Sequence, residues 1–246
     1  MKLPEHERQA YREAFRAMSL AQKAEYIFAY YKLPLVIALV AAVALGSVLK
    51  YQLTHKDALL YVAYANVELA EEDDRNIFDG FLKSQDANPR TTEVYRYYGL
   101  YLTDPEGSVD HQYSYASRLK LTAAIDAEQL DVVLMNQEAY DLLSHSGYLA
   151  DLQTTVCECN PDLLPQAGPL ICGNDVIIKD NQVELDLGEA DAYEAVTEQH
   201  GNAFDVSELP AFRNLGLSDR VYLGIIGNTP RRKEALDLVS YLLNEG

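Results

Sequence analysis

The longest uncharged stretch of the chain lies near its N-terminus. Residues 33–49 read LPLVIALVAAVALGSVL and stand between Lys32 and Lys50. As a helix this run is about 26 Å long, and tyrosines on both flanks would extend it towards the ~30 Å hydrocarbon core of a membrane. The pattern predicts one transmembrane helix over 33–51, held in the lipid bilayer.

A cleaved signal peptide is the alternative for this stretch. The residues Ala42-Val43-Ala44 have the small-x-small form of a cleavage site. However, 32 residues precede the apolar run, which is long for the basic region of a signal peptide, and the run continues beyond Ala44. We therefore favour a signal anchor that is not removed.

The first 32 residues have the pattern of an amphipathic helix. Tyr11, Phe15, Met18, Ile27 and Phe28 are among the apolar residues that recur with a 3.6-residue period. Basic residues fall elsewhere on the helix, as expected beside an anionic inner leaflet. The sequence thus predicts a cytoplasmic juxtamembrane helix over 1–32, with a docking helix for a membrane-protein partner as the alternative.

Strands and helices alternate in the remaining residues, 57–246. Apolar, β-prone runs predict strands at 58–67, 92–102 and 132–135, and a helical pattern follows each of them. This order is typical of an α/β domain with a mostly parallel sheet covered by helices.

The second half of this region is less regular. We expect a hairpin over 175–187 that turns at residues 180 and 181, and a short helix over 191–200. A strand over 221–226 and a closing helix over 231–244 complete the predicted domain.

Composition and charge support a folded, acidic domain. The 246 residues are 48% hydrophobic, which excludes disorder, and the net charge of −18 argues against a nucleic-acid partner. Residues 1–32 carry a net charge of +2, whereas residues 57–246 carry −22. This asymmetry predicts location in the cell membrane, with a cytoplasmic N-terminus and an extracellular C-terminal domain.

Three cysteines are the only candidates for a covalent cross-link. Outside the membrane, Cys157 or Cys159 is expected to pair with Cys172 and to stabilise the loop by ~3 kcal/mol. Three free thiols are the alternative in an anaerobic bacterium, and a metal or redox site is a weaker one.

Catalytic and cofactor motifs are not found in the sequence. The five histidines are isolated, and no Gly-x-Ser-x-Gly, P-loop or Gly-x-Gly-x-x-Gly pattern occurs. The acidic cluster at 71–74 and the acidic residues over 184–191 lack the spacing of a calcium loop. We predict neither an enzyme nor a metal or cofactor site, and interpret the acidic clusters as solvated surfaces.

Two segments resemble bacterial extracellular solute-binding proteins. Residues 130–152 (LDVVLMNQEAYDLLSHSGYLADL) are similar to their strand and helix ending in a Gly-Tyr-Leu turn, and residues 221–246 (VYLGIIGNTPRRKEALDLVSYLLNEG) to their late strand and final helix. The resemblance implies a type-2 periplasmic-binding fold. Because only about 70 residues separate the two segments, it also implies a reduced second lobe or insertion over 153–220.

A ligand cleft in such an α/β sheet would lie at the carboxyl ends of the strands. Asn66, Asn136 and Asn228 each follow a predicted strand, and Tyr64 is a candidate for stacking on a ligand. Asparagine is also common in turns and helix caps, so a purely structural role is the alternative.

Two hypotheses for function follow. The first is a membrane-anchored extracellular binding module that recognises a small solute or peptide. The second is an accessory or structural subunit of a membrane complex that binds no ligand of its own.

Overall fold

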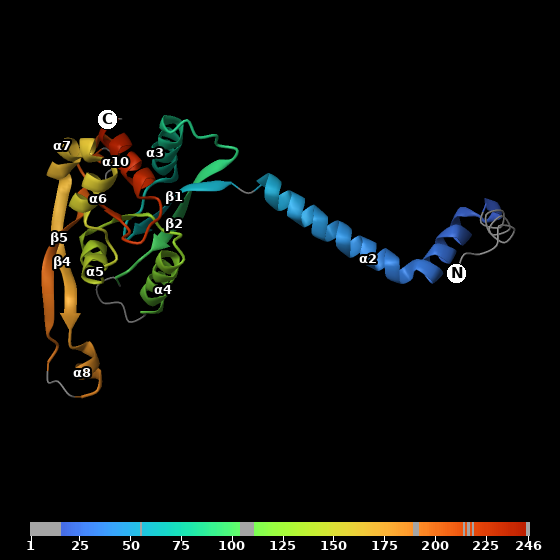
Figure 1. The fold of residues 1–246 in the computed structure, drawn as a ribbon, viewed down its shortest axis with the longest axis horizontal. Helices are drawn as coiled ribbons and strands as arrows, with labels where there is room; N and C mark the ends of the chain where they lie inside the picture. The colour runs from blue at the N-terminus through green and yellow to red at the C-terminus, as the bar shows by residue number, and fades with distance from the viewer. Residues whose placement is uncertain are drawn as a thin grey trace. The chain divides into compact units, whose positions relative to one another are not determined.

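The protein divides into two compact units, Met1–His55 and Lys56–Gly246. The structure is a computed structural model that describes residues 16–54, 56–103, 111–188, 192–213, 215, 217 and 219–244 (Figure 1). Some side chains within 20–35 and 52–54, and the side chain of residue 184, are not described. Residues 1–15 of the predicted amphipathic helix therefore lie outside the described residues.

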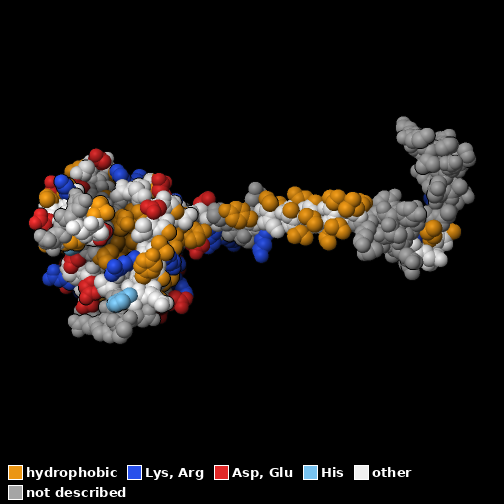
Figure 2. Space-filling model, turned by 90° about the horizontal axis from the view of Figure 1, so that it is seen from below, with side chains coloured by type: hydrophobic (Ala, Val, Ile, Leu, Met, Phe, Trp, Pro, Cys, Tyr) orange, Lys and Arg blue, Asp and Glu red, His pale blue; other side chains and the backbone are white. Residues whose placement is uncertain are grey.

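One long helix, α2 (Leu20–Thr54), forms most of the described part of the first unit. It continues through Pro34, so the predicted segments 1–32 and 33–51 are not separated by a break in the helix. The large apolar side chains described from Leu33 to Tyr51 are each 51–73% exposed (Figure 2).

The structure corrects the predicted transmembrane helix over 33–51. Among the residues that it describes, no helix combines the length and the apolar content needed to cross a membrane. The uncharged run ends at Lys32 and Lys50, and its ~26 Å falls short of a ~30 Å hydrocarbon core. The predicted cytoplasmic and extracellular placement of the two ends stays a prediction.

The second unit is an α/β domain built on one mixed sheet. Its strands are β1 (Asp57–Ala65), β2 (Thr92–Leu100), β3 (Val132–Met135), β4 (Ile171–Asp180), β5 (Ala195–Asp205) and β6 (Tyr222–Ile225). The strand order is β2-β1-β3-β6-β5-β4. β1 runs parallel to both β2 and β3, whereas the β3–β6, β6–β5 and β5–β4 pairs are antiparallel.

The prediction of a mostly parallel sheet is therefore wrong for the second half of the chain. Parallel neighbours need a long crossover, usually a helix, as α3 (Glu71–Ser84) and α4 (Gln112–Asp126) provide between the first strands. Between β5 and β6 the described residues include only the four-residue helix α9 (Pro210–Arg213), and these strands are antiparallel neighbours.

Helices cover both faces of the sheet (Figure 1). The other helices of this unit are α3 (Glu71–Ser84), α4 (Gln112–Asp126), α5 (Gln137–His145), α6 (Leu152–Cys159), α7 (Leu164–Ala167), α8 (Gln182–Asp186) and α10 (Arg232–Asn244), with short 3₁₀ turns η1 (Pro161–Leu163) and η2 (Gly168–Leu170).

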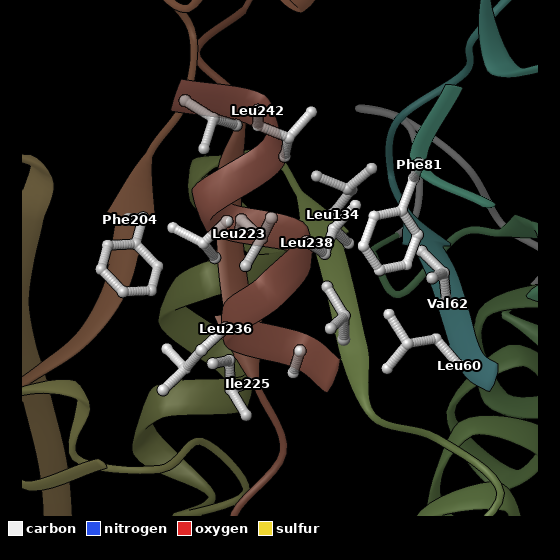
Figure 3. Close-up of a cluster of buried hydrophobic side chains, with 14 of the residues drawn as sticks. Leu60, Val62, Phe81, Leu134, Phe204, Leu223, Ile225, Leu236, Leu238 and Leu242 are labelled. Atoms are coloured by element: carbon white, nitrogen blue, oxygen red, sulfur yellow. The ribbon is translucent and has the colours of Figure 1, made fainter. Parts of the chain in front are cut away.

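The main core lies between the sheet and helices α3 and α10. Leu236, Leu238 and Leu242 of α10 face strand residues that include Leu134 and Leu223 (Figure 3). These side chains are at most 2% exposed, so their burial is a major source of stability. A second cluster on the opposite face joins α4 and α5 to the sheet through residues such as Leu121 and Leu143.

Residues 153–220, predicted as a reduced second lobe or an insertion, belong to the same compact unit as the rest of the domain. Their strands β4 and β5 extend the same sheet, and α6 contacts both α10 and β5. The predicted hairpin and helix are also different in detail: residues 182–186 form the helix α8, and residues 195–200 belong to strand β5.

Candidate functional site

A pocket of about 430 Å³ lies where the parallel strands β1 and β2 approach their carboxyl ends and α3 begins. Its walls are formed by Leu69, Glu71, Asp74, Arg75, Arg96 and Tyr98. Open α/β sheets commonly place ligand sites at the carboxyl ends of their strands. We refer to this pocket as the Asp74 pocket.

Asp74 is the central group of the pocket wall. Its side chain is only 3% exposed and accepts hydrogen bonds from the hydroxyls of Tyr64 and Tyr98, the latter at 2.7 Å. Arg96 Nη1 lies 2.8 Å from Asp74 Oδ2 and compensates its charge. A buried carboxylate is stable only when it is paired and hydrogen-bonded in this way.

Strand register brings these partners to one face of the sheet. In the parallel pair, Val62 of β1 is opposite Arg96 of β2. Because side chains alternate along a strand, Tyr64 and Tyr98 lie on the same face as these residues. The rings of Tyr64 and Tyr98 stack with their centroids 5.3 Å apart and an interplanar angle of 4°.

The two tyrosines differ in access to solvent. Tyr64 is buried, whereas Tyr98 is 52% exposed and lines the pocket. The Arg96 guanidinium also lies 5.8 Å from the centroid of the Phe78 ring, which fixes it from the α3 side. The pocket therefore has a hydrogen-bonded floor and an aromatic wall formed by Tyr98.

Burial, and next the hydrogen bond to the Asp74 carboxylate, raise the pKa of Tyr98 to about 12 from an ordinary value of 10.0. The same causes, in the same order, raise the pKa of Tyr64. Both hydroxyls thus remain protonated donors to Asp74 throughout the physiological pH range.

This arrangement predicts a loss of stability at alkaline pH. Because the pKa of Tyr98 is higher in the folded state, its contribution is complete below pH 10 and is lost as the pH rises towards about 12. In Tyr98→Phe, the free energy of unfolding should therefore decline less steeply over this range than in the wild type. Urea denaturation at a series of pH values measures both slopes, and equal slopes would refute the assignment.

The first turn of α3 forms the outer wall of the pocket. Ala70, at the N-cap, supplies no side-chain acceptor for the N–H groups of this turn. Arg75 pairs with Glu71 at 2.6 Å, but the two side chains are 60% and 87% exposed. Such exposed pairs contribute little to stability, so a ligand could replace either partner at small cost.

Asn66, one of the predicted ligand residues, does not line the pocket; its side chain binds the residues that follow β2. Its backbone has a positive φ of 56°, which asparagine tolerates better than most residues. Its Oδ1 accepts the Leu102 N–H at 2.6 Å, and its Nδ2 donates to Thr103 Oγ1 at 2.7 Å. The side chain thus joins the ends of β1 and β2.

The structure does not bring the three predicted asparagines together. Asn136 caps helix α5 by accepting the Ala139 N–H at 3.0 Å. Asn228 follows β6, which runs antiparallel to β3, so it lies near the amino end of β3 and not near its carboxyl end. Its Nδ2 donates to the Ile125 carbonyl at 2.8 Å. Of the four predicted ligand residues, only Tyr64 contacts Asp74, through its hydroxyl.

Sequence reasoning missed all six residues that line the pocket, including Asp74, Arg75 and Arg96. The acidic run at 71–74 indicates a helix start, and its interpretation as a solvated surface is wrong for Asp74, which is 2% exposed. A useful signal was the alternation of Val94, Arg96 and Tyr98 along β2, because it places a cation and an aromatic ring on the face that α3 covers.

The three cysteines are free thiols. Cys157 and Cys159 are exposed on α6, and Cys172 is partly buried at the start of β4, so the predicted disulfide is not formed in this structure. Burial raises the pKa of the Cys172 thiol, which lowers its reactivity. Within the described part of the chain, no group of three or more potential ligands is arranged to hold a metal ion.

Comparison with known protein families and with curated proteins finds no match for this chain.

Proposed function

We propose that the unit Lys56–Gly246 is a binding module for a small zwitterionic solute, an amino acid or a short peptide, and that this ligand occupies the Asp74 pocket. The supporting observation is the pocket itself: about 430 Å³, with side chains of both charges and an exposed aromatic ring in its wall. This volume falls within the range of small-molecule sites in proteins.

The charges of the wall determine the class of ligand. A ligand carboxylate is attracted by Arg75 and by the N–H groups at the start of α3, where the helix dipole is positive. A ligand ammonium group is attracted by Glu71, and an apolar side chain can pack against Tyr98. A zwitterion satisfies both charges, whereas a simple anion that binds Arg75 would leave Glu71 without a counter-charge.

The chemistry of the lining favours binding over catalysis. The pocket wall contains no serine, cysteine, histidine or lysine among its described residues. Asp74 and Arg96 are already engaged with each other, so neither is free to transfer a proton. The resemblance of residues 130–152 and 221–246 to solute-binding proteins adds support, and that resemblance is itself a prediction.

A thermal-shift screen of the full chain tests this function. Amino acids, dipeptides and sugars are added one at a time, and a ligand at 100 times its Kd should stabilise the folded state by about 2.7 kcal/mol. We expect zwitterions to raise the melting temperature and neutral sugars to leave it unchanged. The proposal fails if no amino acid or dipeptide stabilises the protein.

Two substitutions locate the site. Arg75→Gln and Glu71→Gln should each weaken binding by about tenfold or more, because each removes one charge-assisted contact. Lys233→Gln is the matched control, since Lys233 is exposed and forms an i,i+4 pair with Asp237 on α10, outside the pocket. Equal affinity in all three variants would place the ligand elsewhere.

A further inference from the structure

The strands β4 and β5 form a hairpin that extends beyond the rest of the sheet, with α8 at its end (Figure 1). The two strands pair from Ile171 opposite Phe204 to Asp180 opposite Ala195. β5 pairs with β6 only at Phe204 and Asp205. The last three residues of β4 and the first five of β5 are exposed, so the distal half of the hairpin has little support from the core.

Apolar side chains gather at this distal end. Their exposed fractions are 53% for Ile178, 68% for Val183, 68% for Leu187, 47% for Tyr193 and 60% for Val196. Val183 and Leu187 are four residues apart across α8, which places them on one side of this single helical turn. We call these five residues the hairpin tip.

Specific hydrogen bonds hold the tip in shape. Asn181 Nδ2 donates to the Ala192 carbonyl at 2.9 Å, and Asn181 Oδ1 accepts the Glu194 N–H at 2.7 Å. The Tyr193 hydroxyl donates to Asp180 at 3.2 Å, and Gln182 donates to Asp186 at 2.8 Å. The exposed apolar side chains are therefore held in place by a hydrogen-bonded backbone. A group of exposed apolar residues is typical of an interaction site.

Charge decides among the possible occupants of this surface. From residue 178 to residue 198 the sequence holds seven acidic residues and one lysine. Two copies of such a segment repel each other, which disfavours a dimer formed through the tips. Anionic lipid is repelled for the same reason, whereas a protein surface with apolar residues bordered by Lys and Arg is attracted.

We propose that the hairpin tip is a docking surface for a partner protein that presents an apolar patch bordered by basic residues. This surface is independent of the Asp74 pocket, and neither proposal depends on the other. Burial of Val183 and Leu187 provides the binding affinity. The acidic residues of this segment orient the basic partner and make its binding depend on salt concentration.

A designed peptide serves as the probe. Its helix carries leucines on one face and lysines beside them, and its binding to the full chain is followed by fluorescence anisotropy. In the double variant Val183→Ser/Leu187→Ser we expect affinity to fall by about tenfold or more, because two apolar side chains are lost. We also expect wild-type binding to weaken as salt is added.

The matched control is Tyr115→Ser/Leu119→Ser. These residues of α4 are also four apart and are 69% and 59% exposed, so this variant should retain wild-type affinity. Both double variants should melt at the wild-type temperature, because the substituted side chains are exposed.

Three results would overturn the proposal. One is unchanged affinity in the Val183→Ser/Leu187→Ser variant, and another is equal affinity for a peptide in which glutamates replace the lysines. The third is tip-dependent binding to phosphatidylglycerol vesicles or tip-dependent dimerisation in light scattering, since either would assign the surface to lipid or to a second copy of the chain.

Discussion

The variant Asp131→Ala is expected to lose about 3–5 kcal/mol of unfolding free energy, the largest effect of a single substitution considered for this protein. Asp131 precedes β3 and has no exposed surface. Its Oδ2 accepts the Tyr61 N–H of β1 at 2.8 Å, and its Oδ1 lies 3.1 Å from Arg231 Nη1. It also accepts the Thr229 hydroxyl.

This carboxylate therefore joins three parts of the domain: β1, the start of β3 and the turn that leads into α10. Its removal leaves a buried N–H without its acceptor and Arg231 without its counter-ion, and both changes are costly. Arg231 lies 4.9 Å from the centroid of the Tyr61 ring, so its stacking would partly persist. This contact and the 26% exposure of the Arg231 side chain keep the expected loss within the stated range.

Urea denaturation measures the effect, with Asp126→Ala as the control. Asp126 is an exposed residue at the end of α4, and its replacement should change the free energy of unfolding by no more than about 0.5 kcal/mol. A loss below about 1 kcal/mol in Asp131→Ala would contradict the central position of this residue.

The second large effect is expected for Asp74→Ala, at about 2–4 kcal/mol. The substitution leaves the Tyr64 hydroxyl buried without its acceptor and removes the counter-ion of Arg96. We expect a smaller loss than at Asp131 because Arg96 is 23% exposed and Tyr98 is half exposed, so water can solvate them.

Glu72→Ala is the matched control, because Glu72 is an exposed acid in the same first turn of α3. It should cost at most about 1 kcal/mol through the helix dipole. If the two variants lose equal stability, the effect of Asp74 is that of a helix-terminal charge and the hydrogen-bonded cluster has no special role.

A double substitution separates the ion pair from the rest of the cluster. Once Asp74 is alanine, Arg96→Met should cost less than it does in the wild type, because the two residues interact directly at 2.8 Å. Additive losses would show that the pair contributes nothing measurable.

The sequence was most informative where periodicity and length agreed. The predicted strand over 58–67 and the helix that starts at the acidic run are β1 and α3 in the structure. The closing helix over 231–244 is α10, Arg232–Asn244. These elements have long apolar patterns whose burial the fold requires, so the pattern and the structure coincide.

Secondary-structure prediction failed where the apolar residues of a short segment fit both the strand and the helix periodicity. Val183, Leu185 and Leu187 alternate as in a strand, yet Val183 and Leu187 also have helical spacing, and the structure forms α8 there. Residues 195–200 belong to β5 because they pair with β4 across the hairpin, a long-range contact that local propensity does not reveal.

The candidate site was hard to predict because strand direction and burial are properties of the whole fold. Asn228 follows a strand as Asn66 does, but β6 is antiparallel to its neighbour β3. The two asparagines therefore lie at opposite ends of the strands. Asp74 is the one residue of its acidic run that is buried, since the register of β2 places Arg96 and Tyr98 beneath it.

A calorimetric titration of the full chain with a dipeptide and its two blocked forms tests the proposed zwitterion site most directly. We expect the free dipeptide to bind, and both the N-acetylated and the C-amidated forms to bind at least about tenfold more weakly, because each lacks one charge. Equal binding of all three forms, or binding unaffected by Arg75→Gln and Glu71→Gln, would contradict the proposal.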